Sequence, residues 1–195
     1  MGSLAWALQY INEKYMTTSI NKVFQVDHPI AEVWDNLTDP EKIVTCVPGA
    51  SLTQKVDDNN YKGQVQLKFG PVKAGYEGLI HFVERDAAAK KMSLKGTGVD
   101  IKGKGGAEMT MKGQLTEKGA GTGSPGTEVN VTMDLNITGM LAQFGSRLVN
   151  DVSNQVFDQF VENFKKKLAG GKVDNTLHAG SVVGGVIKGI FGGKS

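Results

Sequence analysis

The sequence predicts an α+β fold in which a curved antiparallel sheet wraps around one long C-terminal helix. Between residues 61 and 137, apolar and polar residues alternate, which is the period of strands with one buried face. From residue 141 to residue 164, apolar residues recur every three or four positions, the period of an amphipathic helix. With 26 glycines and 7% aromatic residues, the 195-residue chain favours a sheet-rich domain with many turns over a helical bundle.

A strand and two short helices are expected at the start of the domain. Residues 20–26 alternate apolar and polar side chains and predict the first strand. Pro29 suits the first turn of the helix that follows. Asp39 is a good N-cap for a second helix with Pro40 in its first position, and residues 47–49 end that helix.

The next five predicted strands form an antiparallel meander, because each has one apolar face and short turns separate them. They cover residues 61–69, 72–84, 92–94, 107–115 and 129–137. The last helix is expected to have roughly 28 residues, about 40 Å at 1.5 Å per residue. Gly170 and Gly171 end it. Its apolar stripe needs a cover, and the apolar face of the sheet is the large surface that remains.

Four parts of the chain are expected. Residues 1–15 form an N-terminal extension, either a tag or an interaction helix, since Leu4, Leu8, Ile11 and Tyr15 fall at helical spacing. Residues 16–169 form the domain, residues 170–176 a linker, and residues 177–195 an amphipathic membrane-binding tail. Six lysines and one acidic residue follow residue 164, whereas the rest carries 16 basic and 19 acidic residues. A basic end on a mildly acidic body favours an anionic surface, although lysines also suit the C-terminus of a helix.

Catalytic and metal-binding motifs are missing from the sequence. Cys46 is alone, so neither a disulfide within the chain nor a cysteine-based metal site is expected, and we interpret it as a small buried residue. His28 is interpreted as a cap and His81 as solvent-facing, because His81 is out of phase with its apolar neighbours. Residues 121–126 match Gly-x-Gly-x-x-Gly, but they lie between two strands without a following helix to receive phosphates. Basic residues alternate with acids and no aromatic cluster accompanies them, so no nucleic-acid partner is expected.

No signal peptide is visible, so a cytoplasmic location is expected. No run reaches the roughly 18 apolar residues of a spanning helix. We therefore expect the protein to be peripheral, on the inner face of the cell membrane.

Three blocks of sequence resemble the CoxG family of carbon monoxide dehydrogenase subunits. The first is DHPIAEVWDNL at residues 27–37 followed by CVPGA at 46–50, the second is FGPV at 69–72, and the third is GMLAQFGSRL at 139–148. The resemblance covers about residues 17–168 and implies the START-like, polyketide cyclase-like (SRPBCC) helix-grip fold, which encloses a hydrophobic cavity between sheet and helix. It also implies a membrane-linked accessory of a molybdenum hydroxylase of the aerobic carbon monoxide dehydrogenase type. The first fifteen residues lie outside the family pattern.

An apolar ligand is expected in that cavity, with an isoprenoid quinone (menaquinone or ubiquinone) or a lipid as the hypothesis and no covalent cofactor. Methionines adapt to flexible ligands, and glycines within strands mark bending or room for a ligand. The alternative is that the same side chains simply pack the core. The expected ligand-binding residues are Val65, Leu67, Phe69, Tyr76, Ile80, Phe82, Met109, Met111, Met133, Leu135, Leu141, Phe144 and Leu148.

The tail is expected to bind the membrane through its apolar helical face and its lysines. A glycine-rich helix is unfavourable in water, at about 1 kcal/mol for each glycine relative to alanine, so a membrane or partner has to cover it. The alternative is a disordered tail. The expected membrane-binding residues are Val183, Ile187, Lys188, Ile190 and Phe191.

Three functions remain open from the sequence. The first is a non-enzymatic carrier of quinone or lipid that recruits the hydroxylase to the membrane. The second is a cyclase or hydratase that uses Tyr61, Tyr76 and Glu77 in the same cavity. The third is a scaffold with an inert core. We rank the enzyme last, because paired acids and bases are scarce.

Overall fold

The computed structural model describes residues 15–69, 72–103, 105–119 and 125–177. It contains a seven-stranded antiparallel sheet in the order β1-β7-β6-β5-β4-β3-β2. The strands are β1 (Tyr15–Val26), β2 (Ala50–Lys55), β3 (Asn60–Phe69), β4 (Val72–Asp86), β5 (Lys91–Asp100), β6 (Gly106–Lys118) and β7 (Gly126–Thr138). The helices are α2 (Ile30–Leu37), α3 (Pro40–Ile43) and α4 (Gly145–Leu168), with short 3-10 turns η1 (Val44–Cys46) and η2 (Ala142–Phe144). The predicted α+β fold is therefore confirmed.

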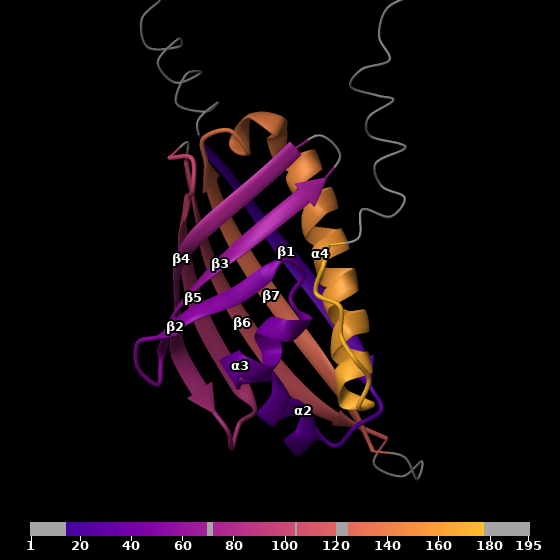
Figure 1. Ribbon diagram of the computed structural model, residues 1–195. Helices are drawn as coiled ribbons and strands as arrows, with labels where there is room; N and C mark the ends of the chain where they lie inside the picture. The colour runs from indigo at the N-terminus through magenta and orange to yellow at the C-terminus, as the bar shows by residue number, and fades with distance from the viewer. Residues whose placement is uncertain (1–14, 70–71, 104, 120–124, 178–195) are drawn as a thin grey trace, which may run out of the picture.

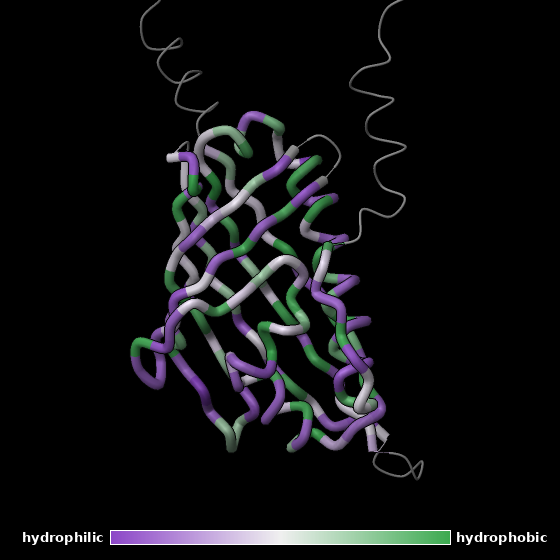
Figure 2. The backbone as a smooth tube through the Cα atoms, in the orientation of Figure 1, coloured by the Kyte–Doolittle hydropathy of each residue, from purple (hydrophilic) through white to green (hydrophobic). Residues whose placement is uncertain are grey.

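The sheet curves around α4, and α2 and α3 lie at the end where β1 finishes (Figure 1). We call the sheet face toward α4 the inner face and the opposite face the outer face. Hydrophobic and hydrophilic residues alternate along the strands, as expected for a sheet with one covered face (Figure 2). β1 returns beside β7, so the first and last strands close one side of the sheet.

The caps of the short helices follow from local chemistry. Asp39 accepts hydrogen bonds from the backbone N–H groups of Glu41 (3.0 Å) and Lys42 (3.3 Å), with Pro40 in the first turn. Burial alone would raise the pKa of Asp39, but these hydrogen bonds outweigh it and lower the pKa. The carboxylate thus stays charged at the N-terminus of α3, where the helix dipole favours a negative group.

Two elements differ from the sequence prediction. The edge strand β2 was not predicted, because its six residues carry little periodic signal. The last helix has 24 residues and begins at Gly145, not at residue 141. Gly145 has φ of +77°, a left-handed conformation that separates η2 from α4 and changes the phase of the residues before it. Gly170 also has positive φ, at +75°, and ends the helix as predicted.

Candidate functional site

Nine of the predicted ligand-binding residues lie on strands with their side chains on the inner face. They share the phase of the buried residues on the same strands, such as Val131 and Ile137 on β7. Of the nine, Tyr76 and Phe82 are buried and the others are half-buried. The nine are Val65, Leu67, Tyr76, Ile80, Phe82, Met109, Met111, Met133 and Leu135. Phe69 is also predicted on a strand, but its side chain lies outside the described residues.

The three predicted ligand-binding residues that follow the sheet differ in burial. Leu141 is buried and Leu148 is half-buried, and both pack near the start of β1. Phe144 is 42% exposed in η2, and its contact with the ligand stays a prediction. The left-handed Gly145 separates η2 from α4, so Phe144 does not continue the apolar stripe of that helix. The predicted membrane-binding residues of the tail lie outside the described residues.

Apolar side chains of the described residues form three clusters around the inner face. The first fills the end next to α2 and includes Phe24, Trp34 and Phe164. The second fills the opposite end, where Met16, Ile137 and Val149 meet. The third lies on β3, β4 and β5, away from α4, and is built on Tyr61, Phe82 and Leu94. The three clusters thus pack the two ends of the interior and the side formed by β3, β4 and β5.

The middle of the inner face is less tightly covered than its ends. Met133 and Leu135 on β7 are half-buried and belong to none of the three described clusters. β7 is flanked by β1 and β6, so solvent can reach these side chains only from the inner face. Because a packed core leaves few spaces as large as a water molecule, this exposure indicates unfilled space between sheet and helix.

Polar groups on the inner side are occupied by the protein itself. Thr18 donates to Oδ1 of Asn150 on α4 at 2.7 Å. Asp100 is buried and accepts from the backbone N–H of Lys102 at 2.7 Å. Burial, and then the negative charge of Asp100, raise the pKa of Tyr76 and keep its phenol neutral.

The residues weighed for catalysis do not converge on one space. Tyr76 faces inward and Glu77 faces outward, as neighbours on a strand must, so they cannot line the same cavity. The Tyr61 hydroxyl donates to the Asp58 carbonyl at 3.0 Å. His81 Nδ1 lies 2.8 Å from Oδ1 of Asn60. In the described part of the chain, no three His, Cys, Asp or Glu side chains gather to hold a metal ion.

Two further residues weighed for chemistry have structural surroundings. Cys46 is fully buried, and burial raises the pKa of its thiol, so the reactive thiolate is disfavoured. His28 does not cap a helix N-terminus; its Nδ1 lies 3.1 Å from Oε2 of Glu32, one turn along α2. Neither group points into the inner space, so neither supplies an acid, base or nucleophile there.

The segment after α4 covers the gap between the helix and β2. Residues 171–176, which we call the strap and which lie within the predicted linker of residues 170–176, run back beside α4 (Figure 1). The buried Asn163 of α4 donates to the carbonyls of Cys46 and Asp174, both at 3.1 Å. Gly49 N–H donates to the Asn175 carbonyl at 2.6 Å, and the Asn175 side chain donates to the Ala50 carbonyl at 3.1 Å. Sequence reasoning missed this closure, because no periodic pattern announces it.

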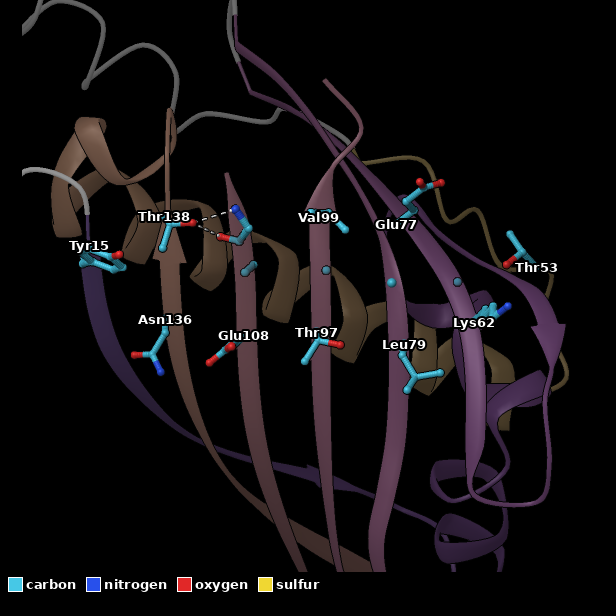
Figure 3. A pocket seen from close by; sticks show the side chains of 15 residues that line it. Tyr15, Thr53, Lys62, Glu77, Leu79, Thr97, Val99, Glu108, Asn136 and Thr138 are labelled. Carbon is cyan, nitrogen blue, oxygen red and sulfur yellow. Dashed lines mark hydrogen bonds between the residues drawn. The ribbon is translucent and has the colours of Figure 1, made fainter. Parts of the chain in front are cut away.

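A hollow with a volume of about 950 Å³ lies on the outer face of the sheet. We call it the outer trough. Its floor is the backbone of Gly63, Gly78 and Gly98, which pair with one another across β3, β4 and β5 and have the same phase as the inward Tyr76. Two rows of outward side chains flank the floor, with α4 visible behind the sheet (Figure 3). One row is Lys62, Leu79, Thr97, Glu108 and Asn136, and the other includes Glu77, Val99 and Thr138.

A second hollow, of about 340 Å³, also lies on the outer face, and most of the residues that line it are polar. Neither hollow includes the predicted ligand-binding residues. The unfilled inner space therefore rests on the exposure of side chains such as Met133 and Leu135, and the outer trough is a separate feature.

A curved antiparallel sheet around a long C-terminal helix, with an apolar interior, defines a helix-grip fold. The chain belongs to the CoxG family of carbon monoxide dehydrogenase subunits, whose model matches residues 23–169. A search of curated proteins finds no match. The CoxG match excludes the N-terminal segment and ends one residue after α4.

Solved structures support the same fold. A conserved protein from Geobacillus kaustophilus is 22% identical with a TM-score of 0.69, covering 80% of this chain and 96% of its own. The Zhui aromatase/cyclase from Streptomyces sp. R1128 is 12% identical with a TM-score of 0.55, covering 80% and 100%. A truncated norcoclaurine synthase from Thalictrum flavum is 11% identical with a TM-score of 0.55, covering 82% and 98%. At these identities the likeness concerns the fold alone.

Proposed function

We propose that this protein is a non-catalytic accessory of a molybdenum hydroxylase, of the aerobic carbon monoxide dehydrogenase type, that carries an apolar ligand between sheet and α4. The ligand is an isoprenoid quinone or a lipid. The family supports the partner, since it is named for a component of carbon monoxide dehydrogenase. The observation that carries the ligand proposal is the half-exposed, unclustered pair Met133 and Leu135 in the middle of the inner face.

The chemistry of the inner surface suits a flexible apolar chain. Met109, Met111 and Met133 stand on β6 and β7, and all three are half-buried. Unbranched thioether side chains change shape at low cost and so accommodate ligands that bend. Burying the remaining apolar area against a ligand would stabilise the complex by about 25 cal/mol per Å².

The polar groups on the inner face suit the binding of a ligand better than they suit catalysis. Asp100 is engaged by a backbone N–H, and the neutral Tyr76 has no basic neighbour within the described hydrogen bonds. General acid–base chemistry needs a titratable group within hydrogen-bond reach of the reacting atom. The outward Glu77 cannot supply one to the interior.

Membrane attachment is the second part of the proposal, and it rests on the tail sequence and on where the strap delivers it. The strap reaches the flank of α4, where the Gln159 side chain donates to the Thr176 carbonyl at 2.5 Å. The described chain therefore ends beside the Gln159 turn of α4, not at the C-terminal end of that helix. No helix of the described residues is long and apolar enough to cross a membrane.

The ligand proposal is tested by extraction. The full chain is purified from native membranes and extracted with organic solvent, and mass spectrometry is expected to find a quinone or lipid near one per protein. Met133→Trp fills the inner space and is expected to lower ligand content severalfold. Val23→Trp, at an exposed β1 position, is the matched control and should retain the ligand. A ligand-free interior in the unmodified protein contradicts the proposal.

The anchor is tested by flotation with vesicles that contain anionic lipid. The full chain is expected to float with the vesicles, and a chain without residues 177–195 is expected to remain at the bottom of the gradient. High salt should weaken flotation of the full chain, because the lysine contribution is screened. Equal flotation of both chains contradicts the anchor.

A further inference from the structure

Exposed apolar side chains of the described residues concentrate at one end of the sheet. At this end β3, β5 and β7 finish and α4 begins, and α2 and α3 lie at the other end (Figure 1). Single exposed apolar residues are ordinary, but a concentration of them marks a contact surface. Four of the seven large apolar side chains that are exposed in the described residues stand here, and we call them the rim: Tyr15, Val99, Ile101 and Phe144.

The turn between β5 and β6 holds Ile101 in its exposed position. The Ile101 N–H donates to the Gly75 carbonyl at 3.0 Å, and a Cβ on Gly75 would come within 2.7 Å of Cδ1 of Ile101. The buried Asp100 fixes the turn, because its carboxylate accepts from the Lys102 N–H and its carbonyl from the Gly103 N–H, both at 2.7 Å. The backbone thus presents a 55% exposed isoleucine and the lysine after it.

Basic side chains accompany the rim. At the tips of β3 to β7, from the row of Val99 outward, and in the first turn of α4, four of the described residues are basic and exposed. The acidic residues there are Glu77, beside Val99 at the margin, and the buried Asp100. The four basic residues are Lys68 and Lys73, which face each other on the β3–β4 hairpin, Lys102 and Arg147.

The opposite end of the molecule is different. Residues 27–44 contain five acidic residues and one basic residue, Lys42. The lysines of the last turn of α4 stand beside them, since Lys167 Nζ donates to the Lys42 carbonyl at 2.6 Å. That end has mixed charge, whereas the rim combines exposed apolar groups with an excess of positive charge.

We propose that the rim docks on an anionic membrane surface, with Ile101 and its apolar neighbours entering the interface and the four basic side chains against lipid phosphates. This docking surface rests on the membrane attachment proposed above and adds to it a contact made by the folded domain. Binding at such an interface strengthens with the apolar area buried and with each basic residue near anionic lipid.

The arrangement suits lipid better than a protein partner. The cores of protein interfaces are depleted in lysine, whereas three of the four basic residues here are lysines set among the apolar groups. A lysine can lay its stem along apolar surface and keep its ammonium among headgroups, so it does not oppose the entry of its neighbours.

The strap runs toward the same end. Its Asp174 carbonyl accepts from Asn163, and its Thr176 carbonyl accepts from Gln159, one turn nearer to the start of α4. The described chain is therefore heading toward the rim where it stops, and a membrane at the rim lies on that course.

A dye at the rim tests the contact. Ile101→Cys in the full chain is labelled with an environment-sensitive maleimide dye, which the buried Cys46 does not reach. When phosphatidylcholine vesicles that contain phosphatidylserine are added, the emission is expected to shift to the blue and rise severalfold. Val83→Cys, at a 54% exposed position toward the other end of β4, is the matched control and should not respond.

Charge reversal tests the lysines. Lys68→Glu with Lys102→Glu is expected to weaken binding of the full chain to these vesicles severalfold, as measured by sedimentation over a range of lipid concentrations. Lys91→Glu with Lys112→Glu, at exposed positions around the second hollow, changes the net charge by the same amount and should weaken binding much less. Equal losses mean that net charge alone attracts the protein, and they overturn the proposal.

The remaining outcomes separate this surface from the tail. If the full chain binds vesicles while the dye at position 101 stays unchanged, the tail alone holds the protein, so the rim proposal fails and the anchor stands. A dye response to a purified molybdenum hydroxylase and not to vesicles means a protein contact and also overturns it, as does a response that grows with protein concentration alone. A full chain that does not bind vesicles overturns both the rim and the anchor and leaves the ligand proposal untouched.

Discussion

Asn163 shows how one polar side chain can hold an otherwise apolar helix in place. It is 4% exposed on the face of α4 that meets η1, and its amide donates to the carbonyls of Cys46 and Asp174. Those carbonyls belong to segments without regular strand partners, so the amide satisfies backbone groups that would otherwise be buried without hydrogen bonds. One residue thereby joins α4, the turn before β2 and the strap.

Asn163→Ala is expected to destabilise the protein by about 1–3 kcal/mol, because two carbonyls lose their donor in a region that water reaches poorly. Urea unfolding followed by circular dichroism measures the change. Asn154→Ala, at an exposed position of the same helix, is the control and should change stability by less than about 0.5 kcal/mol. Equal effects of the two substitutions would mean that the bridge contributes no stability.

At the scale of elements, paired glycines differ in how closely they let neighbouring strands approach. A Cβ on Gly78 would lie 1.8 Å from the Thr97 carbonyl oxygen, so β4 and β5 approach too closely there for any side chain. A Cβ on Gly98 would meet the Tyr76 Cβ at 3.4 Å, an ordinary contact. The close approach of β4 and β5 thus depends on Gly78 far more than on Gly98.

Gly78→Ala is therefore expected to cost more than about 3 kcal/mol or to prevent folding, since the neighbouring backbone has to move. Gly98→Ala, one strand away, should remain within about 1 kcal/mol of the parent protein. Thermal and urea unfolding of both variants make the comparison. A tolerated Gly78→Ala would show that β4 and β5 can separate at this position without loss of stability.

Element types followed from the sequence wherever one period ran for many residues. The long strands and α4 were predicted because alternation or helical spacing dominates them. The same alternation predicted that side chains such as Val65 and Tyr76 lie on the inner face. β2 was missed because a six-residue edge strand carries too few periods. The predicted start of the last helix was wrong, because one left-handed glycine, Gly145, separates η2 from α4.

The functional surfaces were only partly predictable for a related reason. Periodicity tells which face a side chain occupies, and so it identified the inner apolar set around Met133 and Leu135. It does not tell how far α4 stands from the sheet, which depends on side chains from distant elements. The strap and the outer trough arise from long-range pairings, such as Gly49 with Asn175 and Gly63 with Gly78, and local patterns do not encode them.

As a whole, the molecule has one tightly packed end and a looser middle. At the end next to α2, the ring of Phe24 meets the rings of Phe157, Phe160 and Phe164 edge-on at centroid distances of 5.9 to 6.2 Å. Phe164 is fully buried. The stability that fixes α4 against the sheet is thus concentrated at this end, which leaves the middle of the interior available for a ligand.

Two leucines on neighbouring strands allow the packing of the end and of the middle to be compared. Leu115 of β6 is 2% exposed in the packed end, whereas Leu135 of β7 is half-buried in the middle. Leu115→Ala is expected to cost about 2–5 kcal/mol in the ligand-free protein, because it opens a cavity in a filled region. Leu135→Ala should cost about 1 kcal/mol, because fewer neighbouring atoms lose contacts. Urea unfolding of both variants, after solvent extraction and refolding, provides the numbers. Equal costs would mean that protein atoms fill the middle as densely as the end, and no room for a carried molecule would remain.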